Sequence, residues 1–208
     1  MASSAEHEKN EEIAVQLSLE EKASLDEIIK QAELSLESEE VLNQSLAVVA
    51  GNESLDEAAA GLLQFVAVAG VLRNQTKGPL AVMAEKIWAG YFVKKFPNPI
   101  GPVSTGGFAM AGKDRVEAAV VYYGKNKRGV DCGWLLGFVA TKDDGKVYVD
   151  CGKKEKYIHI NWGDIKAKIE HGSKIYKHFD KDTGTSVIAT IQGKNGKYAV
   201  GAAFAFLG

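Results

Sequence analysis

The hydrophobic pattern of this chain changes its period near residue 64. Before that point apolar residues recur at helical spacing, and after it they form short runs separated by Gly, Asp and Asn. The charge changes there too: residues 1–60 hold 15 acidic and 3 basic residues, whereas residues 61–208 hold 12 acidic and 22 basic residues. We therefore predict an acidic helical arm over residues 1–64 and a β-sandwich body over residues 65–208.

The arm is expected to contain three helices. The first begins at Ser18, where Ser18 and Glu21 fit a capping box. Its apolar stripe consists of Leu25, Ile28, Ile29 and Ala32. A second stripe runs from Leu42 to Val49, and a third helix begins at Ser54. Helices this short are marginal alone, so the arm needs a surface to pack against.

The body is predicted to form about nine strands and one helix. The fold class is mainly β with N-terminal helices (α+β), and the strands form an antiparallel sandwich because little helix separates them. The helix is expected at Trp162–His171. The predicted strands cover residues 65–74, 80–93, 103–111, 116–124, 133–141, 145–151, 173–179, 185–192 and 197–207.

Composition and targeting signals favour a cytoplasmic globular protein. A hydrophobic content of 46% is too high for a disordered chain, and the first residues do not resemble a signal peptide. The longest apolar run, Ala58–Leu72, is shorter than the roughly 20 residues of a membrane-spanning helix. Cys132 and Cys151 are expected to be free thiols, about four residues out of register in a hairpin centred on Asp143 and Asp144.

Several segments of the body resemble the plant jasmonate-induced proteins. The resemblance covers roughly residues 65–206 and leaves out the acidic arm. It rests on the segments Val71–Thr76, Gly107–Phe108, Ala118–Gly129, Cys132–Leu136, Val147–Tyr148 and Trp162–Ile165. It implies a β-sandwich from a plant stress or defence context, with no established enzymatic activity.

The order of these segments is also similar to that of the actinoporins, which are pore-forming β-sandwich toxins. Actinoporins recognise choline lipids through an aromatic-rich connection between strands. The corresponding connection here, Thr141–Gly145, is short, acidic and free of aromatic residues, so an aromatic cage for a quaternary ammonium group is not expected. The acidic arm also opposes docking on anionic membranes.

Motifs for catalysis and for cofactors are weak. Gly107–Lys113 matches the glycine and lysine spacing of a phosphate loop, but Asp114 follows it and the next segment reads as a strand. The four histidines have no close metal-binding spacing, and no nucleophile-elbow motif is present. We expect no cofactor, no metal site and no catalytic residue, although enzymatic activity stays open.

Two groups of residues are candidate binding sites. Exposed aromatic side chains at Trp88, Tyr91 and Trp162 could contact a lipid, glycan or small molecule, although most aromatic residues of a sandwich belong to its core. Clustered cations suggest a surface for anions. These cations are Lys125, Lys127, Arg128, Lys153, Lys154 and Lys156. Only 3 of the 25 basic residues are Arg, which argues against sequence-specific binding to nucleic acid.

Three functions remain open from the sequence. The leading hypothesis is a non-enzymatic plant stress or defence protein that binds a ligand or a membrane surface. The alternatives are a pore-forming relative of actinoporins and an enzyme with a pocket at the end of the sandwich. We further expect the arm to lie against a basic face of the body or to mediate a homo-oligomer, so deletion of residues 1–60 should strengthen binding to anionic surfaces.

Overall fold

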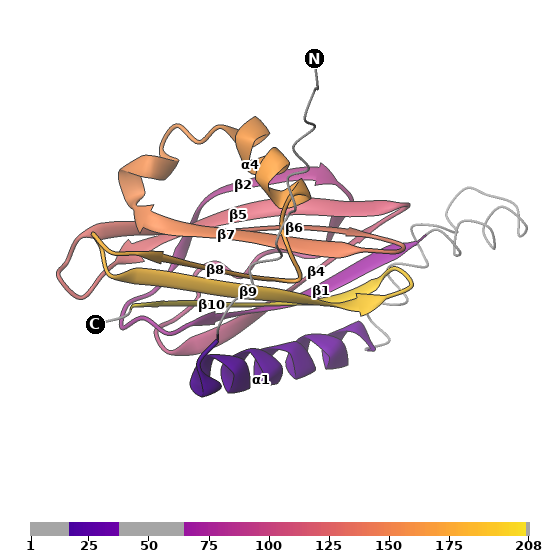
Figure 1. Ribbon diagram of the computed structural model, residues 1–208, viewed down its shortest axis with the longest axis horizontal. Coiled ribbons are helices and arrows are strands. Elements are labelled where there is room, and N and C mark those ends of the chain that lie inside the picture. The colour runs from indigo at the N-terminus through magenta and orange to yellow at the C-terminus, as the bar shows by residue number, and fades with distance from the viewer. Residues whose placement is uncertain (1–16, 38–64, 207–208) are drawn as a thin grey trace, which may run out of the picture.

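The computed structural model describes residues 17–37 and 65–206, in which two β-sheets stack face to face (Figure 1). The larger sheet has the strand order β3-β4-β1-β10-β9-β8, and the smaller sheet has the order β2-β5-β6-β7. The helices are α1 (Leu19–Leu36), the 3-10 helix η1 (Lys154–Tyr157) and α4 (Trp162–Glu170). The strands are β1 (Val66–Asn74), β2 (Ala81–Ala89), β3 (Tyr91–Lys94), β4 (Ser104–Gly112), β5 (Arg115–Lys125), β6 (Asp131–Thr141), β7 (Gly145–Lys153), β8 (Ile175–Asp180), β9 (Thr185–Lys194) and β10 (Lys197–Phe206).

The predicted sandwich is confirmed, with two differences in its strands. The strand expected at residues 80–93 is divided at Gly90, whose positive φ of 86° lets the chain leave the smaller sheet as β2 and enter the larger sheet as β3. The other difference is that β1 and β10 pair in parallel, with Gly70 opposite Val200. The whole body separates these two strands along the chain, so no hairpin constrains them to be antiparallel.

The space between the sheets is filled by large side chains. Every second residue of β6 faces this core, including the fully buried Trp134 and Phe138. The opposite face of β6 carries Gly133 and Gly137, which leave room for the ring of Tyr157 and the side chain of Ile169. A Cβ atom at either glycine would lie 2.4 Å from those side chains. The glycines thus allow η1 and α4 to lie directly on the smaller sheet.

Helix α1 packs on the outer face of the larger sheet, below the sandwich in Figure 1. The capping box is present, with the Ser18 amide 2.9 Å from Oε2 of Glu21. All four residues of the predicted stripe are buried against β1, β9 and β10. Ion pairs of 2.9 Å between Arg73 and Glu27 and 2.6 Å between Lys177 and Glu21 flank this apolar contact. Deletion of residues 1–60 would therefore also uncover an apolar face.

Some expectations fall outside the described residues or stay untested. The second and third predicted helices, at 42–49 and from residue 54, lie outside the described residues. The division into an arm of 1–64 and a body of 65–208 stays a prediction. No helix within residues 17–37 and 65–206 is both long enough and apolar enough to cross a membrane.

Both cysteines are buried free thiols. The β6–β7 turn is centred between Lys142 and Asp143, because Ala140 pairs with Gly145. This register places Cys151 opposite Trp134, and Cys132 therefore lies two residues out of register rather than four.

Candidate functional site

Three connections between strands meet at one end of the sandwich. They are the β5–β6 turn at residues 126–130, the passage from β7 into η1, and the β8–β9 turn at residues 181–184. Cys132 of β6 pairs with both Gly124 of β5 and Lys153 of β7, which sets the first two connections side by side. All six predicted cations lie on these connections or at the strand ends beside them. We call this region, with Lys181 added, the basic end: Lys125, Lys127, Arg128, Lys153, Lys154, Lys156 and Lys181.

Two of these cations are held in ion pairs. Lys125 Nζ lies 2.9 Å from Oδ1 of Asp131, and its hydrogen bond and charge lower the pKa of that carboxyl group. Lys156 Nζ lies 2.6 Å from Oδ2 of Asp150, whose side chain is almost completely buried. Nε2 of His178 approaches Oδ1 of the same carboxylate at 3.3 Å. Part of the charge of Lys125 and Lys156 is therefore neutralised within the protein, although both side chains remain exposed.

Other cations of the basic end face solvent without a carboxylate in ion-pair contact. Within the described residues, no carboxylate forms an ion pair with Arg128, Lys153, Lys154 or Lys181. Lys154 Nζ stands 4.6 Å above the centre of the Tyr123 ring, which is a cation–π contact. Large apolar side chains are exposed nearby, with exposed fractions of 39% for Val130 and 53% for Ile158. The surface therefore combines positive charge with accessible hydrophobic groups.

A buried asparagine fixes the geometry of two of the connections. Oδ1 of Asn126 accepts hydrogen bonds from the amides of Arg128 and Val130, each at 2.9 Å. Its Nδ2 donates to the carbonyl of Thr183 in the β8–β9 turn, also at 2.9 Å. Nη2 of Arg128 donates to the neighbouring carbonyl of Asp182. The β5–β6 and β8–β9 turns are therefore joined by direct hydrogen bonds.

The β8–β9 turn also has its own internal support. Oδ2 of Asp180 accepts a hydrogen bond from the Thr183 amide at 3.0 Å and another from the Thr183 hydroxyl. The Thr183 hydroxyl also lies 2.7 Å from that of Thr185. Asn126 and Asp180 were not singled out in the sequence, although both residue types are common in turns because their side chains bond nearby backbone groups.

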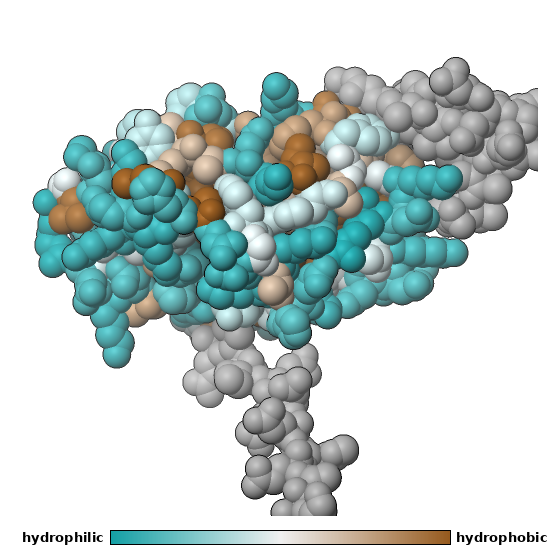
Figure 2. Space-filling model, turned by 90° about the horizontal axis from the view of Figure 1, so that it is seen from above, coloured by the Kyte–Doolittle hydropathy of each residue, from teal (hydrophilic) through white to brown (hydrophobic). Residues whose placement is uncertain are grey.

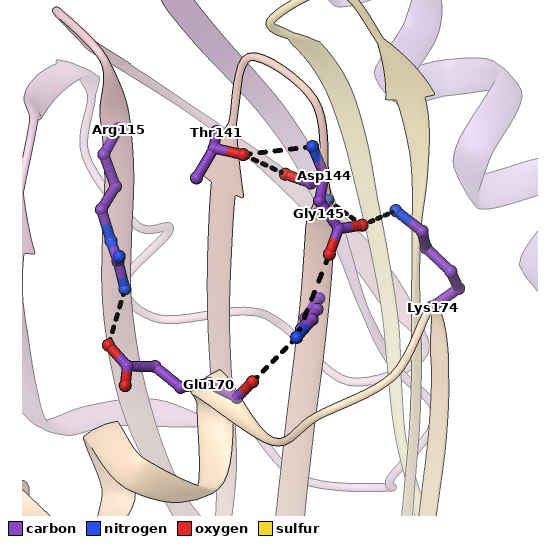
Figure 3. A network of polar contacts seen from close by, with 7 residues as sticks. Arg115, Thr141, Asp144, Gly145, Glu170 and Lys174 are labelled. Atoms are coloured by element: carbon purple, nitrogen blue, oxygen red, sulfur yellow. Dashed lines mark hydrogen bonds and ion pairs between the residues drawn. The ribbon is translucent and has the colours of Figure 1, made fainter. Parts of the chain in front are cut away.

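The opposite end of the sandwich holds its cations in a network (Figure 3). We call it the paired end; it comprises the start of β5 (Arg115–Glu117), the β6–β7 turn, the C-terminus of α4 and the start of β8. Arg115 lies 2.9 Å from Oε1 of Glu170, and Lys174 lies 2.6 Å from Oδ1 of Asp144. Lys146 donates to the carbonyl of Glu170 at 3.0 Å. The hydrogen bond from Lys174 is the main cause of a lowered pKa at Asp144.

The structure brings two of the three aromatic candidates into direct contact. Trp88 and Trp162 meet edge to face, with ring centres 6.0 Å apart, and both pack against the apolar cluster beneath α4. Tyr91 lies on β3 in the other sheet, and burial raises its pKa. Figure 2 looks from the α4 side and shows small hydrophobic patches among mostly hydrophilic residues. A ligand role for the three aromatic residues stays a prediction.

The described residues show neither a metal-binding cluster nor an activated thiol. Within residues 17–37 and 65–206, no three His, Cys, Asp or Glu side chains converge to hold a metal ion. Burial raises the pKa of Cys132 and brings that of Cys151 to about 11. Both thiols are therefore protonated at neutral pH, and a protonated thiol is a poor nucleophile.

Fold and surface together define a two-sheet β-sandwich protein with a helix on its larger sheet and a basic end. The chain belongs to the jasmonate-induced protein family. It is 36% identical to a jasmonate-induced protein homolog of Atriplex canescens over 139 residues, which are 63% of this chain and 75% of the relative. No family model matches the sequence. The resemblance to the jasmonate-induced proteins is thus confirmed.

A solved structure has a similar fold. The crystal structure of the lipid binding protein Nakanori matches with a TM-score of 0.56, covering 90% of this chain and 93% of that one. The two sequences are only 16% identical, so the likeness concerns the fold. A similar overall fold therefore occurs in a protein of low sequence identity to this chain.

Proposed function

We propose that this protein is a non-enzymatic, stress-related binding protein that docks on anionic lipid surfaces through its basic end. The observation that carries the proposal is the convergence of solvent-facing cations from three connections, with Val130 and Ile158 exposed beside them. The membership of this chain in the jasmonate-induced protein family supports the stress context. The similar fold of a protein described as lipid binding supports a lipid as ligand.

The expected free energy of binding indicates that docking is reversible. A cation near an anionic leaflet contributes about 1 kcal/mol. Four such cations would therefore give about 4 kcal/mol, which corresponds to roughly millimolar affinity. Partial burial of Val130 and Ile158 would add to this, since full burial of such a side chain gives about 1.5–3 kcal/mol. The electrostatic part should weaken as salt is added.

The proposal also predicts where the protein acts and whether it forms pores. Anionic lipids are concentrated on the cytoplasmic leaflet, so the proposal places the protein in the cytoplasm. Docking does not require α1 to leave its sheet, where an apolar stripe and two ion pairs hold it. We therefore expect docking on vesicles without release of an encapsulated dye.

Co-sedimentation with vesicles tests the proposal. The double variant Lys153→Glu/Lys154→Glu should lose most of the binding to vesicles that contain phosphatidylserine. The matched control is Lys142→Glu/Lys194→Glu, which makes the same change in net charge with exposed lysines at the opposite end. Equal binding by both variants, or no binding by the unaltered chain, would contradict docking through the basic end, and dye release would favour a pore instead.

A further inference from the structure

A small hollow lies within the basic end, between the β5–β6 and β8–β9 turns. Its volume is about 290 Å³, close to the lower limit of about 300 Å³ for small-molecule pockets. It is lined by Lys127, Arg128 and Lys181, together with Asn126, Thr183 and the ring of Phe206. No Asp or Glu is among the described residues that line it. The hollow is therefore a small concave surface with three cationic side chains.

The lining comes from two turns that are fastened to each other. Asn126 bonds both turns through its side chain, and Asp180 holds the Thr183 amide and hydroxyl. These bonds fix the backbone from which the three cations extend toward the hollow. Such preorganisation reduces the entropy that a ligand must overcome on binding.

Arg128 has a geometry suited to a tetrahedral oxyanion. Its Nη2 donates to the Asp182 carbonyl, which fixes the guanidinium, and that hydrogen bond uses one of five donors. A guanidinium can bind two phosphate oxygens in parallel, and Lys adds a point charge with three donors. Lys181 reaches the hollow from the opposite turn, and its side chain makes no hydrogen bond or ion pair with any described residue.

We infer that this hollow binds a phosphomonoester group, carried either by a lipid headgroup or by a free phosphorylated compound. A phosphomonoester carries a charge of about −1.5 to −2 at pH 7 and three terminal oxygens. It can enter a small hollow end-on, because it is substituted on one side only. A phosphodiester is flanked on both sides and has about one negative charge. The inference rests on the proposed function, for which it names the ligand chemistry.

The test separates the hollow from the surface around it. Full-length protein is titrated with glycerol 3-phosphate, a soluble monoester, and with glycerophosphoglycerol, a soluble diester. It is also sedimented with phosphatidylcholine vesicles that contain either phosphatidic acid or phosphatidylglycerol, at matched vesicle charge. We expect glycerol 3-phosphate and phosphatidic acid to bind more tightly than their diester counterparts.

Two double variants remove equal charge from the same end. Arg128→Gln/Lys181→Gln should weaken glycerol 3-phosphate binding by about tenfold or more for each lost charge-assisted hydrogen bond and should abolish the preference for phosphatidic acid. Lys153→Gln/Lys154→Gln lies outside the hollow and should leave glycerol 3-phosphate binding unchanged. It should weaken binding to both kinds of vesicle equally. Lys181→Gln alone guards against a folding defect, since that side chain has no partner among the described residues.

The outcomes distinguish the two proposals. Vesicle binding that shows no preference for a monoester, without binding of glycerol 3-phosphate, would overturn the hollow and leave membrane docking intact. Binding of glycerol 3-phosphate without vesicle binding would support the hollow with a free phosphorylated compound as ligand, and would refute membrane docking. If Arg128→Gln/Lys181→Gln and Lys153→Gln/Lys154→Gln weakened glycerol 3-phosphate equally, the hollow would not be the site.

Discussion

The basic end and the paired end of the sandwich both carry cations but use them differently. At the paired end, Arg115 and Lys174 each lie within 3 Å of a carboxylate oxygen. At the basic end, Arg128 donates to a backbone carbonyl, and Lys153 and Lys154 have no carboxylate partner within the described residues. A carbonyl orients a guanidinium without cancelling its charge. The number of basic residues in a region therefore does not show how much charge that region offers to a ligand.

The two ends also differ in what stabilises their connections. The basic end depends on the amide side chain of Asn126, which is only 7% exposed. The paired end contains the buried carboxylate of Glu117 under the edge of α4, and around it are more exposed ion pairs. Exposed ion pairs contribute little to stability, whereas a buried polar group that loses its partner is costly. Substitutions can test this difference at each end.

The largest effect is expected for Asn126→Ala at the basic end. The substitution removes three hydrogen bonds and leaves the Thr183 carbonyl and two amides without their partner, so we expect a loss of about 2–4 kcal/mol in the free energy of unfolding. Thr141→Val is the control at the paired end, because Thr141 supports an exposed turn through Asp144, and it should cost about 1 kcal/mol or less. Urea denaturation measures both, and equal losses would remove the distinction between the two turns.

A smaller effect is expected for Glu117→Gln at the paired end. Oε2 of Glu117 lies 3.0 Å from Arg115 and 3.8 Å from Lys166, and its side chain is 1% exposed. Loss of this charge should destabilise the fold by about 1–3 kcal/mol. Glu170 is the other partner of Arg115, and its side chain is 45% exposed. Glu170→Gln should therefore cost less than about 1 kcal/mol of stability. Urea denaturation should give a lower midpoint for Glu117→Gln than for Glu170→Gln. The opposite order would mean that exposed ion pairs stabilise the paired end more than the buried one does.

The smallest effect is the acid sensitivity of the paired end. Lys174 lowers the pKa of Asp144 below its usual 3.8. A carboxyl group with a lowered pKa stabilises the fold above the unfolded value, and this contribution disappears as the pH falls below about 4. Lys174→Ala should cost about 0.5 kcal/mol at neutral pH and almost nothing in strong acid. Thermal unfolding across this pH range measures the effect. The stability difference between Lys174→Ala and the unaltered protein should disappear in acid, whereas any difference caused by Lys142→Ala should not change with pH.

Much of the fold could be predicted because its signals are local. The capping box at Ser18, the stripe of α1 and the apolar run of β6 all appear in the sequence as short-range patterns. Gly90 was not recognised as a break, because a single glycine inside an apolar run gives no sign of its φ angle. The parallel pairing of β1 with β10 depends on residues more than a hundred positions apart, and no local pattern encodes it.

The site was predictable only as a set of cations. Clusters such as Lys125–Arg128 are visible in the sequence, and the structure brings them to one end. The pairing of Lys156 with Asp150 and the fastening of Arg128 to Asp182 depend on how separate strands meet. Lys181 was not selected because it stands apart from the other clusters in the sequence. Its place in the hollow follows from the β8–β9 turn packing beside the β5–β6 turn.

The parallel pairing of β1 with β10 has a consequence for the order in which the fold assembles. Among the described strands, β1 comes first along the chain, and one of its two neighbours, β10, comes last. The surface that receives α1 combines residues from both strands, such as Val71 and Ala203. Helix α1 can therefore complete its packing only after β10 has paired with β1. Long-range contacts of this kind slow folding, so the apolar stripe of α1 should be among the last surfaces of the described chain to be covered.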